Sequence, residues 1–314
     1  MNKAPVLISV YDRPVHFQQC IESLKRNRYA SETHLFVAID APYKKEHQKN
    51  NDRVLEYAKK INGFKEVTLI IREKNFGLNK NLHKAREQLL SIYDTLIFSE
   101  DDNIFSEDFL PFVNKGLEAY KDREDIFSIS GYQYPVVMPE LNQKDVYMWS
   151  GFSAWGCATW KEKLDKIDFS DNTAFLKVRE FLKDYQSIRK INAVADTYLP
   201  ALLLMIKKNQ IHGDIYVCMH QVLHNMYSVF PTVSRVRNMG RDGSGLNCGF
   251  NDYSIYAEQE IYEVQNDYQL PANITRDSKI DSVLKDYFKR DKKANIKNLV
   301  KLFLLNLGFI KFTK

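Results

Sequence analysis

Four short apolar segments alternate with three longer segments of helical periodicity over the first hundred residues, and this alternation restricts the possible folds. The apolar runs are PVLISVY (5–11), HLFVAID (34–40), VTLIIRE (67–73) and TLIFSED (95–101). The segments between them, 15–28, 46–61 and 76–91, carry apolar residues at close to 3.6-residue spacing. Strands that alternate with helices in this way form βαβ units, so we expect a mainly parallel sheet.

The pattern changes after about residue 150. Two further apolar runs, 126–132 and 146–152, predict strands, and helices are expected at 158–167, 173–189, 194–209 and 214–227. A glycine-rich irregular segment, NMGRDGSGLNCG, follows at 238–249. The sequence therefore predicts an α/β half over residues 1–150, a mainly helical half over 151–255 that closes over it, and a C-terminal extension over 256–314.

Charge and cysteine content argue against several classes of protein. The 314 residues carry 45 Lys and Arg against 40 Asp and Glu, and the net charge of +5 is spread along the chain, unlike the concentrated basic face of a nucleic-acid-binding protein. The cysteines show no C-x-x-C pair and no disulfide-framework spacing: Cys20, Cys157, Cys218 and Cys248. The first apolar run is too short for a signal peptide or a membrane span. We expect a cytoplasmic protein with reduced thiols that does not bind nucleic acid.

The last segment, residues 289–314, is both basic and apolar. It combines seven lysines and one arginine with a Leu-, Phe- and Ile-rich stretch that is too short to span a membrane. A basic amphipathic helix of this kind is typical of a peripheral contact with anionic lipid, here on the inner face of the plasma membrane. A terminal helix that packs its apolar face on its own domain would show the same pattern, so both interpretations stay open.

Polar residues follow each strand of the first half. The first strand is followed by Arg13, the second ends at Asp40, the third at Arg72, and the fourth in three consecutive acids, Glu100-Asp101-Asp102. Each could be a helix cap or a turn residue. However, the carboxyl ends of parallel strands form the ligand site of an open α/β sheet, and four polar ends in succession favour such a site.

Carboxylates crowded at one sheet edge repel one another, and their hard oxygens are the ligands that Mg²⁺ and Mn²⁺ prefer when substrate phosphates complete the shell. Consecutive residues that leave a strand point to opposite sides, so Asp101 and Asp102 are not expected to face a metal ion in the same way. One would bind the metal ion and the other a nucleotide ribose.

Two common nucleotide-binding motifs are missing. The sequence has no G-x-G-x-x-G after the first strand and no G-x-x-x-x-G-K-[ST], which argues against dinucleotide oxidoreductases and P-loop enzymes. A sugar nucleotidyltransferase would also place a glycine-rich loop after the first strand, where this chain has YDRP. Phosphates would then be held mainly through a metal ion.

In the acidic motif after the fourth strand and in several other segments, the sequence resembles the GT-A glycosyltransferases. Among these are the N-acetylglucosaminyltransferase that initiates complex N-glycans and bacterial family-2-like sugar transferases. The matching segments cover most of residues 5–250: ISVYDRPVHFQQCIESL, Asp40, NFGLNKNLHKA, SEDDNIFSEDF, WSGFSAWGCATWKEKLDKIDF and GDIYVCMHQVLHNMYSVFPTVSRVRNMGRDGSGLNCG. The acidic segment and VRNMGRDGSG are the more specific of these.

The resemblance implies a GT-A fold, with the first half binding a nucleotide sugar and the second half the acceptor. It implies inverting, metal-dependent transfer of a hexosyl or N-acetylhexosaminyl group from a donor such as a UDP-sugar to a glycan or glycolipid, as in cell-surface polysaccharide or lipopolysaccharide synthesis. Arg13 and Asp40 would lie near the base and ribose, and Asp102 on Mn²⁺ or Mg²⁺. The remaining donor-binding residues would be Asn79, Glu100 and, near the ribose, Asp101.

The resemblance also places a catalytic base on the helix that begins about twenty residues before SRVRN, which selects Asp214. Similar bacterial sequences carry a tryptophan before that aspartate, whereas this chain has Gly213. Asp196, which precedes another apolar helical segment, is the alternative.

Other residues have both a functional and a structural interpretation. Trp149 and Trp155 could stack on acceptor sugars or lie in the core, whereas Trp160 is expected in the core. The glycines at 240, 243 and 245, together with Ser244, could form a loop over the diphosphate or a surface turn. His220 and His224 have a spacing that can hold a metal ion but are expected to be packed or solvated. The functional alternatives are a sugar nucleotidyltransferase and a non-catalytic carbohydrate- or nucleotide-binding protein.

Overall fold

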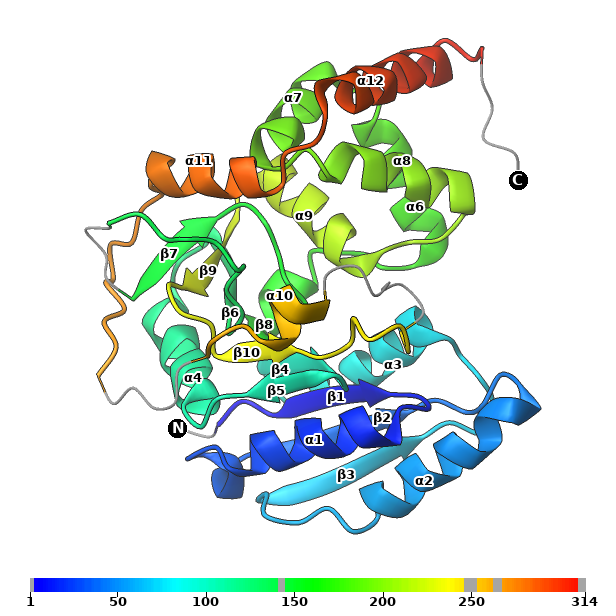
Figure 1. Cartoon of the computed structure of the whole chain (residues 1–314), viewed down its shortest axis with the longest axis vertical. Coiled ribbons are helices and arrows are strands. Elements are labelled where there is room, and N and C mark those ends of the chain that lie inside the picture. Colours follow the sequence, from blue (N-terminus) through cyan, green and yellow to red (C-terminus); the bar gives the residue numbers. More distant parts are fainter. Residues whose placement is uncertain (1–2, 141–144, 246–252, 262–266, 310–314) are drawn as a thin grey trace.

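A computed structural model describes residues 3–140, 145–245, 253–261 and 267–309. It contains one large sheet with helices on both faces, and most of the remaining helices are gathered above one end of that sheet (Figure 1). The C-terminal helix lies at the far side of this helical group.

The large sheet has eight strands in the order β3-β2-β1-β4-β8-β6-β9-β7. Its strands are β1 (Val6–Val10), β2 (His34–Ile39), β3 (Glu66–Ile71), β4 (Thr95–Glu100), β6 (Ile126–Ser130), β7 (Val146–Trp149), β8 (Cys157–Trp160) and β9 (Tyr227–Pro231). β1 pairs in parallel with β2 and β4, and β6 with β9, whereas β8 is antiparallel to β4 and β6, and β7 to β9.

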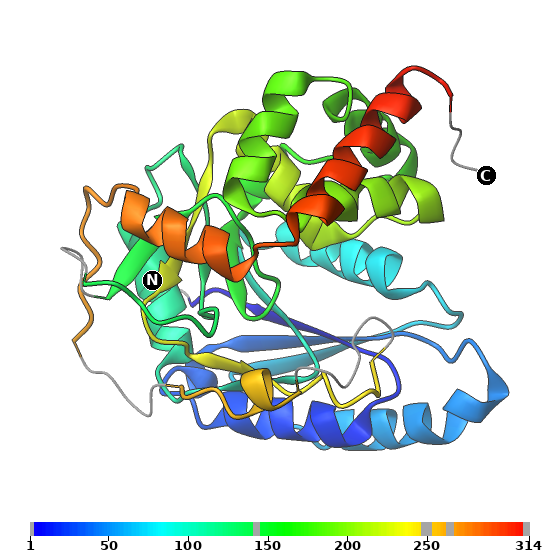
Figure 2. The same ribbon diagram turned by 45° about the horizontal axis from the view of Figure 1, so that its top comes forward.

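Two apolar cores cover the two faces of the sheet, because alternate residues of a strand point to opposite sides. In β1, Val6, Ile8 and Val10 face one core together with α1 (Pro14–Lys25), α2 (Gln48–Ala58) and α4 (Phe109–Ala119). Leu7 faces the other core together with α3 (Leu78–Leu90). Figure 2 shows the resulting layers, with α1 and α2 below the sheet and α3 above it.

The second half of the chain packs on the α3 side and shares its core. Its helices are α5 (Lys161–Leu164), α6 (Asp171–Phe181), α7 (Tyr185–Val194), α8 (Tyr198–Lys208) and α9 (Gly213–His224). α10 (Tyr253–Ala257) crosses the boundary predicted at residue 255, and the extension contributes α11 (Ser278–Tyr287) and α12 (Lys292–Asn306). A small antiparallel sheet joins β5 (Asn103–Phe105) to β10 (Val236–Asn238).

The structure confirms the predicted fold class: an α/β protein with a mainly parallel sheet flanked by helices and a helical second half. Each of the six predicted strands and the three helices of the first half is present. Strands from both sides of residue 150 belong to the same sheet, since β8 lies between β4 and β6. The division at residues 150 and 255 stays a prediction.

Three predictions for the second half were wrong in detail. The helix expected at 158–167 begins as strand β8, whose four residues are all buried between two strands. The helix expected at 173–189 is two helices, because the carboxylate of Asp184 accepts hydrogen bonds from the N–H groups of Gln186 and Ser187 and so starts α7. The helix expected at 214–227 ends at His224, and strand β9, which we did not predict, follows.

No helix among the described residues is both long and apolar enough to cross a bilayer.

Candidate active site

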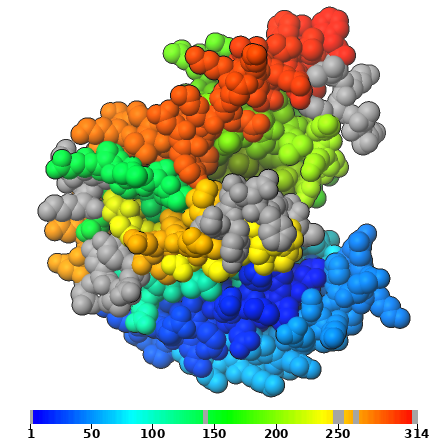
Figure 3. All heavy atoms as spheres, viewed as in Figure 1, coloured from blue at the N-terminus to red at the C-terminus, as the bar shows by residue number. Residues whose placement is uncertain are grey.

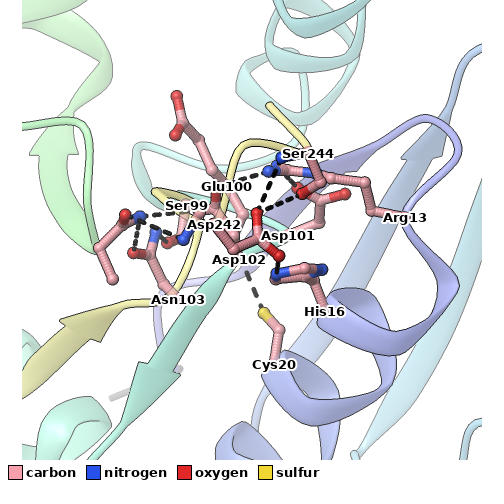
Figure 4. A network of polar contacts seen from close by, with 12 residues as sticks. Arg13, His16, Cys20, Ser99, Glu100, Asp101, Asp102, Asn103, Asp242 and Ser244 are labelled. Carbon is pink, nitrogen blue, oxygen red and sulfur yellow. Dashed lines mark hydrogen bonds and ion pairs between the residues drawn. The ribbon is translucent and has the colours of Figure 1, made fainter. Parts of the chain in front are cut away.

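The acidic motif lies where β4 ends. Glu100 is the last residue of β4, and Asp101 and Asp102 form the turn into β5. Because β4 pairs in parallel with β1, with Glu100 opposite Ser9, the carboxyl ends of both strands meet at one edge. Arg13, which follows β1 and precedes α1, is therefore brought to the acids from 88 positions away in the sequence (Figure 4).

The positive group beside the acids is the guanidinium of Arg13. Its Nη2 donates to Oδ1 of Asp101, and its Nη1 lies 2.9 Å from Oδ2 of Asp102. All three side chains are largely shielded from solvent, with 18% of Arg13 and 6–7% of the two aspartates exposed. Both carboxylates contact this one guanidinium.

A segment after β10 covers the motif. Asn238 donates from Nδ2 to Oδ1 of Asp102 at 3.0 Å, and the N–H of Met239 donates to the Asp102 carbonyl at 2.8 Å. A Cβ added at Gly240 would lie 1.9 Å from Asp102 Oδ2 and 3.3 Å from Arg13 Nη1. Only glycine allows the backbone to approach this closely, so the covering segment depends on Gly240.

The covering segment is also attached to α1. His16, one turn after Arg13, forms an ion pair of 3.1 Å between its Nε2 and Oδ2 of Asp242. The N–H and hydroxyl of Ser244 donate to the other oxygen of Asp242, and Gly243 has a φ of +85°, which favours glycine. Ser244, one of the predicted loop residues, thus lies beside the acidic motif (Figure 4).

Burial is the largest cause of the pKa shifts of Glu100 and Asp101. It raises the pKa of Glu100 to about 8, helped by the charges of Asp102, Asp101 and Asp214 and opposed by Arg13. It raises the pKa of Asp101 to about 7, and here Arg13 opposes the effect while Asp102 adds to it. Burial therefore favours the protonated forms of Glu100 and Asp101, and the positive charge of Arg13 opposes this effect.

The side chain of Asp40 binds backbone N–H groups in this structure. Its carboxylate accepts hydrogen bonds from the N–H groups of Phe76 and Gly77, each at 2.8 Å, and from the side chain of Asn75 at 3.2 Å. These bonds fix the loop that starts α3. A cavity of about 460 Å³ lies next to it, and its lining includes Asp40, Asn75 and Arg72.

The starts of α3 and α9 meet above the acidic motif. Asn79, which we expected to bind donor, donates from Nδ2 to the carbonyl of Ile211 at 2.6 Å. Two residues beyond Ile211, α9 begins, with the exposed Asp214 in its first turn. The charge of Asp214 is the smallest of the causes that raise the pKa of Glu100.

Asp196 has a different environment. It accepts hydrogen bonds from Lys285 Nζ, from the backbone N–H of Arg290 at 3.1 Å and from Asn295 Nδ2 at 2.7 Å. Burial alone would raise its pKa, but these donors outweigh burial and lower it. Asp196 thereby attaches the segment between α11 and α12 to the body of the protein.

The aromatic candidates lie in different places. Trp149 is 1% exposed and stacks on Phe288, with ring centroids 5.5 Å apart, and Trp160 is also buried in the core. Trp155 is half-buried and packs edge-on against Tyr132 and Tyr256. The environment of Trp149 favours the core interpretation for that residue.

The rings of His220 and His224 pack against each other at a tilt of 42°, with centroids 4.3 Å apart. Burial, together with the charge of His224, lowers the pKa of His220 to about 4. Over the described ranges, no group of three or more His, Cys, Asp or Glu side chains is placed to hold a metal ion. Cys20, Cys157 and Cys218 are free and buried, and Cys248 lies outside the described residues.

Sequence reasoning missed three residues of this site: His16, Asn238 and Asp242. All three were inside segments that it quoted, but their ion pair and hydrogen bonds link positions more than 130 residues apart. No local pattern marks such contacts.

No family model matches the chain, and no curated protein matches it. Solved structures with a similar fold include the mannosyltransferase PcManGT from Pyrobaculum calidifontis in complex with GDP-mannose and Mn²⁺, at 12% identity and a TM-score of 0.36, covering 52% of this chain and 46% of that one. They also include TarS from S. aureus, at 13% identity and a TM-score of 0.36, covering 52% of this chain and 29% of that one. TarS residues 1–349 give 17% identity and a TM-score of 0.35, with coverages of 52% and 48%. The chain thus matches half or less of the length of each.

Proposed function

We propose that this protein is an inverting glycosyltransferase that transfers a hexosyl or N-acetylhexosaminyl group from a nucleotide sugar, a UDP-sugar in the first instance, to a glycan or lipid-linked acceptor. The observation that carries the proposal is the presence of two separate acidic sites: the largely buried Glu100-Asp101-Asp102 motif at the ends of β1 and β4, and the exposed Asp214 in the first turn of α9, close to the hydrogen bond that joins the starts of α3 and α9. The motif would serve the leaving group, and Asp214 the nucleophile.

A divalent ion, Mn²⁺ or Mg²⁺, fits the donor chemistry of the motif. Both ions prefer carboxylate oxygens and, when bound with substrate phosphates, need only one or two protein carboxylates. Asp102 would be the principal ligand and Asp101 or Glu100 a neighbour. When bound, the ion would supply positive charge to the departing diphosphate.

The general base would be a carboxylate of the chain itself. Asp214 takes the proton of the acceptor hydroxyl as its oxygen bonds to the anomeric carbon, while the bond from that carbon to the diphosphate breaks and its electron pair leaves with the nucleoside diphosphate. Attack from the face opposite the leaving group inverts the anomeric centre. Asp214 is favoured over Asp196 because the carboxylate of Asp196 is occupied by three donors from the C-terminal extension.

The cavity at Asp40 and Arg72 lies at the same sheet edge and would hold the nucleobase and ribose. Asp40 would contribute through the loop that it fixes, whose Asn75 also lines the cavity. Arg13 and Asp101 would lie between this cavity and the diphosphate. Trp155 is the aromatic residue left for an acceptor sugar.

A peripheral contact with an anionic membrane completes the proposal. Of the apolar side chains of α12, only Leu302 is buried, whereas Ile296, Val300 and Phe303 are 49–63% exposed along one stripe. Lysines 292, 293, 297 and 301 are exposed on the same helix. In Figure 3, α11 and α12 form a ridge along the top of the molecule. Apolar burial and attraction to anionic lipid would act together there.

The test is a thermal-shift panel of UDP-, GDP-, dTDP- and CMP-sugars with and without Mn²⁺, because a ligand that binds only the native state raises its melting temperature. The expected result is a metal-dependent shift with one nucleotide class, followed by release of nucleoside diphosphate from that donor. Release of pyrophosphate from a nucleoside triphosphate and a sugar 1-phosphate would instead identify a nucleotidyltransferase. Binding without any turnover would identify a carbohydrate- or nucleotide-binding protein.

A further inference from the structure

Arg13 already occupies the position of a cation in the acidic motif. Its two terminal nitrogens bind different carboxylates, Nη2 that of Asp101 and Nη1 that of Asp102. The other oxygen of Asp102 accepts from Asn238 at 3.0 Å. Both oxygens of Asp102 are therefore engaged within the chain.

The surroundings hold the guanidinium in place. Gly240 lies against the same Oδ2 of Asp102 on one side and close to Arg13 Nη1 on the other. Asp242 adds further negative charge, since Arg13 is among the groups that lower its pKa. His16 pairs with Asp242 one turn along α1.

We propose that Arg13 is the resident counter-ion of this motif, that a divalent cation binds only when the guanidinium leaves Asp102, and that an anionic diphosphate then provides Arg13 with a new partner. A guanidinium and a divalent ion cannot share one carboxylate oxygen, because two cations a few ångströms apart repel strongly in a buried site. The planar fork of the displaced arginine matches phosphate oxygens. The inference rests on the proposed function, because it assumes an anionic donor and a divalent ion.

This arrangement makes the binding of metal and nucleotide interdependent. Without nucleotide, a metal ion must separate Arg13 from Asp102 and leave a largely buried guanidinium without that partner, which is costly. With nucleotide, the phosphates pair with the guanidinium as the ion takes its place. Metal alone should therefore bind weakly to the native protein, and metal with nucleotide should bind tightly.

The experiment measures free Mn²⁺ by electron paramagnetic resonance during titration of the protein with Mn²⁺ alone. Arg13→Gln, which removes the charge, is expected to bind Mn²⁺ at least about tenfold more tightly than wild type. Arg13→Lys keeps the charge and should bind Mn²⁺ as weakly as wild type. Arg72→Gln, at the neighbouring strand end where Arg72 bonds Asn81, should also match wild type and controls for loss of any arginine at this edge.

Equal or weaker Mn²⁺ binding by Arg13→Gln would overturn the inference. If Arg13→Gln is unstable without metal, its melting temperature should rise with Mn²⁺ alone by more than that of wild type, because the ion replaces the missing counter-ion. A variant that Mn²⁺ does not stabilise more than wild type also overturns the inference.

Asp102→Asn separates this outcome from failure of the proposed function. If wild type with UDP or GDP binds no Mn²⁺, or binds it as well after Asp102→Asn, the metal site itself is misplaced and the proposed function loses its basis. If Mn²⁺ binding requires Asp102 but Arg13→Gln does not strengthen it, only the counter-ion role of Arg13 is wrong.

Discussion

Gly240 lies against the carboxylate of Asp102 so closely that a methyl group in place of its hydrogen would stand 1.9 Å from Oδ2. The atom it would meet belongs to the end of a side chain, but that side chain is held by Arg13 and Asn238 and cannot move freely. The packing of residues 238–244 over the acidic motif therefore requires glycine at position 240.

Gly240→Ala is expected to push the covering segment away from the motif and to lower nucleotide-sugar turnover by at least about tenfold, with a loss of about 1–3 kcal/mol in the free energy of unfolding from overpacking. Steady-state kinetics and urea unfolding test both parts. Gly213→Ala is the matched control for stability, because no atom lies within 4 Å of its added Cβ. Unchanged turnover in Gly240→Ala would show that the covering segment has no part in the reaction.

Asp102→Asn is expected to abolish metal-dependent donor binding while the protein still folds. The amide is nearly the same size and can still accept from Asn238, but it does not attract a divalent ion as a carboxylate does. Isothermal titration of the donor with and without Mn²⁺ measures the effect. Turnover at the wild-type rate in this variant would refute the metal assignment.

Asp214→Asn and Asp196→Asn should behave in opposite ways. Removing a base that acts only on the acceptor lowers the chemical step by about 10²–10⁴ and leaves donor affinity intact. Asp196→Asn should instead lower the melting temperature, since Lys285 and Asn295 lose a charged acceptor, while transfer per folded molecule persists. Single-turnover transfer and thermal melting decide between them. Collapse of transfer in Asp196→Asn alone would move the role of base to Asp196.

The raised pKa values of Glu100 and Asp101 predict a pH-dependent stability. Each group binds a proton in the folded protein at pH values where the unfolded chain has released it, so their contribution is complete below the ordinary carboxyl pKa and is lost as pH rises through about 7 and 8. Without metal, the free energy of unfolding should therefore fall from pH 5 to pH 8. Urea unfolding at several pH values measures it, and Glu100→Gln should make the decline shallower. A decline of the same steepness in that variant would exclude Glu100 as a source.

The apolar stripe of α12 predicts binding to anionic vesicles. Full-length protein should sediment with phosphatidylglycerol-containing vesicles more than with phosphatidylcholine vesicles, and Phe303→Ser should reduce this binding without changing the melting temperature, because Phe303 is 63% exposed. Tyr185→Ser removes another exposed aromatic side chain, on α7, and is the control. If both variants bind vesicles like wild type, or if neutral and anionic vesicles bind equally, α12 is not the contact.

The first half of the fold was predictable from the sequence because its strands are apolar and its helices periodic, as in PVLISVY followed by residues 15–28. Strands β8 and β9 escaped prediction for a physical reason. Each has only four or five residues, and each is stabilised by pairing with neighbours that lie far away in the sequence. Helical periodicity continues into both, so local pattern alone favoured helix.

The site was predictable only in part. The prediction that Arg13 and the acidic motif lie at the same edge of the sheet was correct, because β1 and β4 pair in parallel. The hydrogen-bond partners of individual side chains could not be predicted from the order of the strands. The donor-binding role of Asp40 stays a prediction, whereas the hydrogen bonds from the N–H groups of Phe76 and Gly77 to its carboxylate were not foreseen. Asn79 holds the carbonyl of Ile211. Such bonds depend on loop geometry that residue type does not encode.

The pairing of β5 with β10 has a consequence for exchanging parts between related proteins. Residues 103–105 and 236–238 form one antiparallel ribbon, so the acidic motif is completed by Asn238 and Gly240 from the second half of the chain. In a chimera that joins the first 150 residues to the second half of a related protein, the residues that pack over Glu100, Asp101 and Asp102 would come from that other protein. If the proposed function is right, recombination at that point would alter the donor site together with the acceptor site, and a graft intended to change acceptor preference alone would have to leave residues 236–240 in place.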